Sequence, residues 1–201
     1  MSSPAGGHLR SWIFSYADLV TLLMVFFIIM VSPQSVVSEK QQENMEKLKE
    51  TVKQVQETVK KEHIEEFVEI EQNGNTAKIT MKDRILFAVG HASLDSESEK
   101  RFAPIIESLF ALNNTHEFSI QGHTDSLPVR AGSAFKSNWH LSTERALSVL
   151  DLFIHRGFNQ AKLSAQGFGE NRPLVPNQEP GTGTDLPENR AKNRRVEIYI
   201  K

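Results

Sequence analysis

The sequence predicts a single transmembrane α-helix, then an amphipathic helical linker, then an α+β domain with helices on one face of a mixed sheet. Three observations support this. The run 12–31 is rich in apolar residues and carries no charge apart from Asp18. The stretch 33–66 is rich in Gln, Glu and Lys, with apolar residues in steps of three and four. From residue 67 to 201, helical and strand patterns alternate, as expected for one ordinary domain in a chain of 201 residues.

Composition excludes several classes of protein. The formal net charge of −2 and the pI near 6.4 give no sign of nucleic-acid binding. The chain has no cysteine, which rules out disulfides and cysteine-based metal sites. We expect no resident metal and no cofactor.

The first segments are a tail at 1–11 and a membrane helix at 12–32. The apolar run is close to the roughly 20 residues that span a bilayer. A cleaved signal peptide is the alternative, but the run is longer than the usual signal core and no clear cleavage site follows. Because His8 and Arg10 precede the run, the positive-inside tendency favours a cytoplasmic N-terminus and a single-pass inner-membrane protein with a periplasmic domain.

Asp18 is the most informative residue of the helix. An ionised carboxylate in hydrocarbon costs from about 2.5 to more than about 10 kcal/mol, which favours a residue that binds and releases a proton or cation. Ser11, Ser15 and Thr21 recur with Asp18 at helical spacing and form one polar stripe. Such a stripe implies a partner helix or an aqueous path. The alternative is that Asp18 only bonds a partner helix.

The linker at 33–66 opens with Pro33 and carries an apolar seam with heptad spacing, made of Met45, Leu48, Val52, Val55 and Val59. Three interpretations remain open. The seam could favour a homodimer through a short coiled coil, it could lie against another surface or the bilayer, or the helix could be a solvated spacer.

The domain begins with a hairpin signal, since two strand-like runs at 68–70 and 77–81 flank Asn73-Gly74. Helices are expected over 96–112 and 138–156, the second ending at Gly157. Further strands are expected over 117–121, 162–166 and 195–200.

Two residues on neighbouring elements could clamp a zwitterion. Asp125, in the loop after the third strand, would take an ammonium, and Arg145, in the second long helix, would take a carboxylate. The alternative is a structural Asp–Arg pair that ties the loop to the helix. An enzyme is not indicated: His123 stands near Asp125, but no nucleophile or metal-ligand set accompanies it, so His123 is expected to support the loop.

Four motifs of the domain resemble the peptidoglycan-binding domain of the OmpA family: Gly122-His123-Thr124-Asp125, Leu141-Ser142-x-x-Arg145-Ala146, Gly167-x-Gly169-Glu170-x-x-Pro173 and Asn193-Arg194-Arg195-Val196-Glu197. The resemblance implies that the residues matching Asp125 and Arg145 hold the ammonium and carboxylate of the wall's diaminopimelate. It extends the wall-binding set to Thr124, Asn138, Leu141 and Ser142.

The front of the chain resembles the MotB/PomB stator subunits of the bacterial flagellar motor. The matching residues are Trp12, Tyr16-Ala17-Asp18-Leu19, Thr21-Leu22-Leu23 and Phe26-Phe27. The resemblance implies two copies of this chain inside a ring of MotA-like subunits, commonly five, with the domain gripping peptidoglycan. The stretch beginning near Pro33 would be a plug that blocks ion flow before incorporation.

In that family, the residue matching Asp18 takes up and releases the driving ion. A proton is the favoured ion; sodium is the alternative, with Thr21 as a further ion-binding oxygen or merely a backbone-bonded threonine. Two other functions remain open. One is a MotB-like subunit of a non-flagellar motor, such as Zorya-type anti-phage defence, and the other is a passive peptidoglycan tether.

Overall fold

The computed structural model describes the backbone of residues 6–201 and the side chains of residues 12–30 and 39–201. Helix α1, Gly6–Lys61, contributes to two compact units. The first unit ends at Asn44, and the second is Met45–Lys201. The expected tail at 1–11 lies partly outside the described residues, and the side chains at the start of the expected plug, 31–38, lie outside them as well.

The first unit contains Trp12–Met30, a 19-residue stretch that is long and apolar enough to cross a membrane. Among the described residues it is the one such stretch, and none of it is buried by other parts of the protein. Large side chains such as Phe14 and Ile29 expose 73% and 66% of their surface. A helix of this length whose large apolar side chains are uncovered by protein matches a membrane span.

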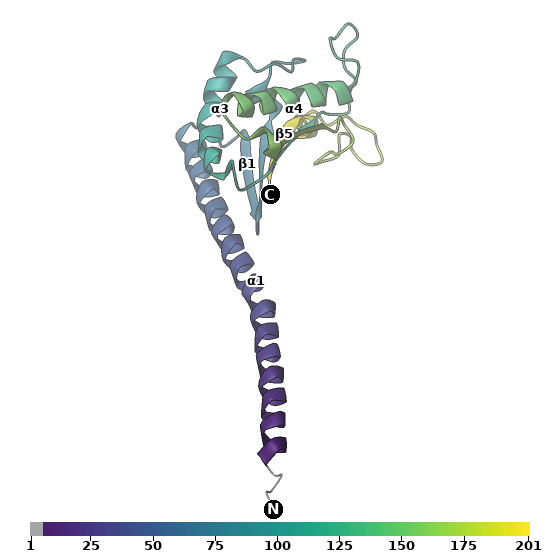
Figure 1. Ribbon diagram of the computed structural model, residues 1–201. Helices are drawn as coiled ribbons and strands as arrows, with labels where there is room; N and C mark the ends of the chain where they lie inside the picture. Colours follow the sequence, from purple (N-terminus) through teal and green to yellow (C-terminus); the bar gives the residue numbers. More distant parts are fainter. Residues whose placement is uncertain (1–5) are drawn as a thin grey trace, which may run out of the picture. The chain divides into compact units, whose positions relative to one another are not determined.

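The second unit is an α+β domain built on a five-stranded sheet (Figure 1). Its strands are β1 (Val68–Asn73), β2 (Thr76–Lys82), β3 (Phe118–His123), β4 (Leu163–Gly167) and β5 (Arg195–Ile200). Its helices after α1 are α2 (Asp83–Leu86), α3 (Ser96–Leu109), α4 (Asn138–His155) and α5 (Pro187–Asn193), with 3₁₀ turns η1 (Phe110–Leu112) and η2 (Gln160–Lys162). The predicted fold class is confirmed.

The sheet has the order β1-β2-β5-β3-β4 and is mixed, because β3 and β4 are parallel while the other neighbours are antiparallel. The β1–β2 hairpin turns at Gly74, whose φ of +57° suits glycine. Short helices α2 and α5 were not predicted; four and seven residues are too few to show a helical period.

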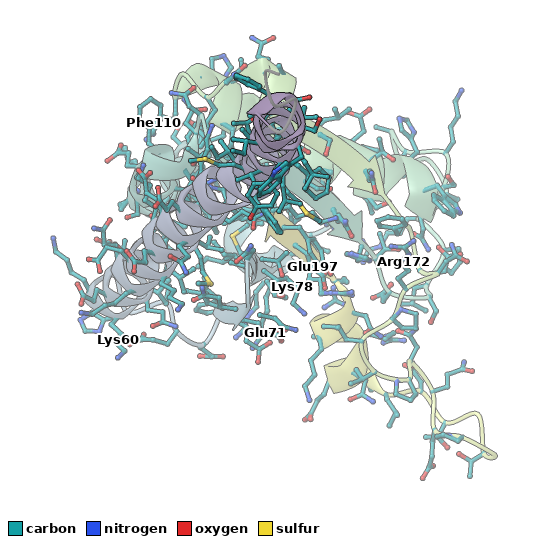
Figure 2. All side chains as sticks on the ribbon, turned by 60° about the horizontal axis from the view of Figure 1, so that its bottom comes forward. Lys60, Glu71, Lys78, Phe110, Arg172 and Glu197 are labelled. Atoms are coloured by element: carbon teal, nitrogen blue, oxygen red, sulfur yellow. The ribbon has the colours of Figure 1, made fainter. Side chains whose placement is uncertain are left out.

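The two faces of the sheet differ in chemistry. Val196, Ile198 and Ile200 alternate along β5 with no exposed surface and belong to the hydrophobic core. The residues between them face the other side: Tyr199 pairs across the sheet with Lys78, which forms an ion pair of 2.8 Å with Glu71 (Figure 2). This period of two places the helices on one face and leaves the other face polar.

The apolar seam of α1 lies in the core of the domain. Leu48, Val52, Val55 and Val59 are 0–5% exposed and share one cluster with the sheet and with α3. A contact of 3.3 Å between the hydroxyls of Thr58 and Ser108 joins α1 to α3. Of the three interpretations of the seam, the structure agrees with packing against another surface, and that surface is the domain's own. The second half of the expected linker is therefore part of the domain.

Candidate functional site

Two candidate sites stand out, one in each compact unit. The first is Asp18, the one carboxylate within Trp12–Met30. The hydroxyl of Thr21 donates a 2.9 Å hydrogen bond to the main-chain carbonyl of Asp18. This is the backbone-bonded arrangement that the sequence left open for Thr21. The oxygen lone pairs of the hydroxyl stay available to a cation, so the bond does not remove Thr21 from an ion site.

The second candidate is a cavity of about 830 Å³ in the domain. It lies where the ends of three strands meet. Asp83 follows β2, Thr124 and Asp125 follow β3, and Arg194 precedes β5. The pairing of β5 with both β2 and β3 fixes this convergence, and the main-chain N–H of Asp83 donates a 3.0 Å hydrogen bond to the carbonyl of Arg194.

Helix α4 brings Arg145 to the same cavity. The helix begins after Ser137, whose hydroxyl accepts a hydrogen bond from the N–H of His140 and caps the first turn. Arg145 is only 2% exposed, and its guanidinium lies 5.1 Å from the ring centre of Phe87. Its Nε donates a 3.1 Å hydrogen bond to the carbonyl of His91. These contacts hold the guanidinium in one orientation, with its face covered and its edge toward the cavity.

Four charged side chains form a continuous series along the cavity wall. Arg145 Nη1 lies 3.1 Å from Asp83 Oδ2, and Arg194 Nε lies 3.6 Å from the same oxygen. Arg194 Nη1 then lies 2.6 Å from Asp125 Oδ2. Asp125 and Arg145 line one cavity, as the sequence predicts, but within the described chain no ion pair joins them directly. The alternative of a structural Asp125–Arg145 pair is therefore not what the structure contains.

Burial and neighbouring charges shift the pKa values of two members of this series. Burial raises the pKa of the Asp83 carboxyl, and the nearby Arg145 and Arg194 oppose that rise. Burial also lowers the pKa of the Arg145 guanidinium, against the pull of Asp83. Arginine nonetheless stays charged at any physiological pH. A buried cation that faces a cavity is suited to bind an anionic group.

The remaining predicted residues divide into two groups. Thr124, Asn138 and Leu141 line the cavity. The hydroxyl of Thr124 is buried and has no hydrogen-bond partner, so it has capacity for a ligand. The amide of Asn138 donates to the carbonyls of Asp125 and Leu127 and so supports the loop that carries Asp125.

Ser142 is not brought to the cavity. Its hydroxyl donates to the carbonyl of Trp139 at 3.0 Å and accepts from the N–H of Gly169 at 2.9 Å. Gly122 and Gly167 make this close approach possible, since a Cβ would lie 2.0 Å from the Ser142 carbonyl oxygen or 2.2 Å from the Thr143 hydroxyl. The serine and the glycines thus fix α4 against β3 and β4, and so fix where Arg145 emerges.

His123 supports the structure, as expected. It is 1% exposed, stacks on Phe168 at 5.4 Å between ring centres, and lies 3.6 Å from a carboxylate oxygen of Glu197. Burial lowers the pKa of His123. Burial works to raise the pKa of Glu197, but His123 and the 2.7 Å hydrogen bond from Arg195 lower it to about 2.

Sequence reasoning missed two members of the cavity wall, Asp83 and the role of Arg194. Both are charged residues directly at the end of a strand, which is the available signal. Their juxtaposition depends on the register that pairs Lys82 with Arg195. A single sequence does not reveal that register.

Family models match both parts of the chain. Residues 86–194 match the OmpA family, and residues 2–52 match a family described as membrane MotB of the proton-channel complex MotA/MotB. Neither description names an enzyme, in agreement with the sequence-based expectation.

Two proteins of one organism are similar to this chain. Motility protein B of Bacillus subtilis is 37% identical over 138 residues, which cover 68% of this chain and 49% of the relative. The chain therefore spans about half the length of that protein. The uncharacterized protein YtxE of the same organism is 25% identical over 95% of this chain and 88% of its own length.

A crystal structure of a MotB-like protein from Desulfovibrio vulgaris matches with a TM-score of 0.68 at 28% identity, over 80% of this chain and 98% of that one. The matches at both ends agree with the order of motifs in the sequence. The chain belongs to the OmpA family through its C-terminal domain, and it is a MotB-like protein with an N-terminal MotB plug segment.

Proposed function

We propose that this protein is the stator subunit of an ion-driven bacterial flagellar motor, which couples ion passage at a membrane Asp to rotation of a MotA-like ring. The carrying observation is Asp18, a carboxylate in a helix whose apolar surface is exposed throughout Trp12–Met30. A plain anchor needs no carboxylate at such a position. The exposed apolar surface would be covered by lipid and by partner helices.

The partners follow from the family. Two copies of the chain would place their helices inside a ring of MotA-like subunits, five in number. The N-terminus would lie in the cytoplasm and the domain in the periplasm. Because the α1 seam is buried in each domain, the homodimer would form through other surfaces than Leu48, Val52 and Val55.

The driving ion is proposed to be a proton. A proton needs only a carboxylate to receive it, whereas sodium needs several oxygens to replace its water. Under the sodium alternative, Thr21 would be a further ion-binding residue through its lone pairs. Its hydrogen is already donated to the Asp18 carbonyl.

The cavity of the domain is proposed to bind peptidoglycan. Asp125 would accept the ammonium of diaminopimelate and Arg145 would take its carboxylate. Thr124 would donate or accept a further hydrogen bond, and Asn138 and Leu141 would shape the wall. This binding would hold the complex still while the ring turns.

Ion flux tests the stator function. Vesicles would contain the full chain and its MotA-like partner, with the plug residues 34–44 deleted so that the channel is open. We expect proton flux that Asp18→Asn abolishes, with both proteins still co-purifying. No flux under either a proton or a sodium gradient, from a complex that is assembled, would instead support a passive tether.

Sedimentation with purified peptidoglycan tests wall binding. We expect Asp125→Asn and Arg145→Lys each to reduce the bound fraction at least tenfold. Arg156→Gln is the matched control, because Arg156 is the residue that ends α4, pairs with Glu107 at 2.7 Å and is not among the residues that line the cavity. Undiminished binding by both cavity variants would remove this cavity as the wall site.

A further inference from the structure

The charged series along the cavity wall contains two residues beyond the proposed clamp. The series runs Arg145, Asp83, Arg194, Asp125, with successive contacts of 3.1, 3.6 and 2.6 Å. Asp83 and Arg194 are the inner pair. The OmpA family match begins at residue 86, so Asp83 lies outside it.

The inner pair occupies the positions that a zwitterion would take. The carboxylate of Asp83 lies on Arg145, where a ligand carboxylate would bind, and the guanidinium of Arg194 lies on Asp125, where a ligand ammonium would bind. Asp125 and Arg145, the buried charges of the clamp, are therefore each paired. An unpaired buried charge would destabilise the domain. The two cations and two anions of this series sum to zero charge. Arg84 and Arg130 also line the cavity but lie outside the series.

The members of the series differ in exposure. The side chain of Arg194 is 36% exposed, whereas those of Arg145, Asp83 and Asp125 are 3%, 12% and 10% exposed. Arg194 is thus the charge that water can solvate if a ligand displaces it. The buried hydroxyl of Thr124 lines the same cavity and has no hydrogen-bond partner, so the site has hydrogen-bonding capacity that the inner pair does not use.

We propose that Asp83 and Arg194 determine the charge specificity of this cavity, selecting a zwitterionic side chain over a purely cationic one. The inference rests on the proposed wall binding. A zwitterion replaces both inner contacts and keeps the net charge of the series at zero. A lone ammonium replaces only the contact of Arg194 with Asp125, and it leaves the series with one excess positive charge in a partly desolvated space.

The test compares two soluble stem tripeptides, L-Ala-γ-D-Glu-meso-diaminopimelate and L-Ala-γ-D-Glu-L-Lys. They differ by one carboxylate at the end of the side chain. Calorimetric titration of the full chain in detergent would give both dissociation constants. We expect the wild type to prefer the diaminopimelate peptide at least tenfold.

Arg194→Gln changes the net charge of the series from zero to −1. It should reduce the preference at least tenfold, chiefly by tighter binding of the lysine peptide. Arg194→Lys keeps the charge and should keep the preference within about threefold. Arg156→Gln, a similarly exposed arginine of an ion pair at 31% exposure, should change neither constant.

Three results would overturn the inference: an Arg194→Gln variant with the wild-type preference, one that loses both peptides while folded, or a wild type that does not discriminate. All three are distinguishable from failure of the proposed wall site. That failure requires Asp125→Asn and Arg145→Lys to bind the diaminopimelate peptide as the wild type does. Melting curves by circular dichroism would establish that each variant is folded.

Discussion

The apolar residues in the two halves of helix α1 have different roles. In Trp12–Met30 the large apolar side chains are exposed, with Leu22 63% and Leu23 52% accessible. In the stretch from Met45 to Lys61, Leu48 and Val55 have no exposed surface. The first pattern leaves a surface for lipid and partner helices, whereas the second completes a core.

The difference shows that apolar content alone does not assign a role to a helix. A helix segment that is apolar around most of its surface has no single apolar face to pack on a sheet. A segment with apolar residues at spacings of three and four has such a face. The position of charge follows the same division. The membrane helix carries a single carboxylate, whereas the domain buries its charges in pairs, as in Arg195–Glu197 and Arg145–Asp83.

Truncation should distinguish the two halves of α1 by the largest effect. A fragment of residues 45–201 should unfold cooperatively, because it keeps the whole core cluster. A fragment of residues 62–201 loses Leu48, Val52, Val55 and Val59. Each contributes roughly 1.5–3 kcal/mol by burial, a sum comparable with the total stability of a domain.

Thermal unfolding by calorimetry would measure both fragments. The shorter fragment should show no cooperative transition. A cooperative transition at the same temperature in both would mean that α1 is an attachment rather than a part of the core.

A single substitution in each half gives the next largest effect. Leu48→Ala should lower the free energy of unfolding of the domain by about 2–5 kcal/mol, since it leaves a cavity at a fully buried position. Leu22→Ala in the membrane helix should leave domain stability unchanged. Urea unfolding of the full chain in detergent, followed by near-UV circular dichroism, would compare the two. Equal losses would contradict the division between the halves.

Strong local patterns made most of the fold predictable. The hairpin at Asn73-Gly74 and the two long helices have periodic apolar residues and recognisable ends. The interpretation of the α1 seam could not be settled, because its spacing suits a coiled coil and a domain surface equally well. Only the hydrophobic core that the sheet and α3 form with the seam, a property of the whole domain, decides between them.

The candidate site was predictable in part for a similar reason. Asp125 and Arg145 belong to motifs that can be recognised in the chain itself. Asp83 and Arg194 meet because of strand register, and Ser142 turns away from the cavity because Gly122 and Gly167 let α4 approach so closely. These are relations between elements, which local patterns do not contain.

The buried charges should make domain stability fall in acid. The pKa of Glu197 is about 2 in the folded state against an ordinary 4.5, so its contribution is present above pH 4.5 and is lost as the pH falls toward 2. At about 1.36 kcal/mol per pH unit, the loss is about 3 kcal/mol. The lowered pKa of His123 acts in the same direction, beginning below pH 6.5.

Urea unfolding of residues 45–201 at pH 7, 5 and 3 would measure this dependence. Glu197→Gln should be less stable than the wild type at pH 7, because Arg195 loses its ionic partner. Its further loss between pH 5 and 3 should be smaller than that of the wild type. Parallel pH profiles would show that other carboxyl groups govern the acid response.

The smallest expected effects come from two threonines that bond alike in the two halves of α1. Thr21 donates to the carbonyl of Asp18 and Thr58 to that of Gln54, each at 2.9 Å. Thr58 also contacts Ser108, so Thr58→Val should cost about 0.5–1.5 kcal/mol of domain stability.

Thr21→Val should leave proton flux within about threefold of the wild type, because a proton needs only the Asp18 carboxylate. A sodium gradient tests the alternative ion with the same variant. If the wild type carries sodium, Thr21→Val abolishes this flux and Thr21→Ser restores it, then the hydroxyl is an ion ligand and sodium is the driving ion.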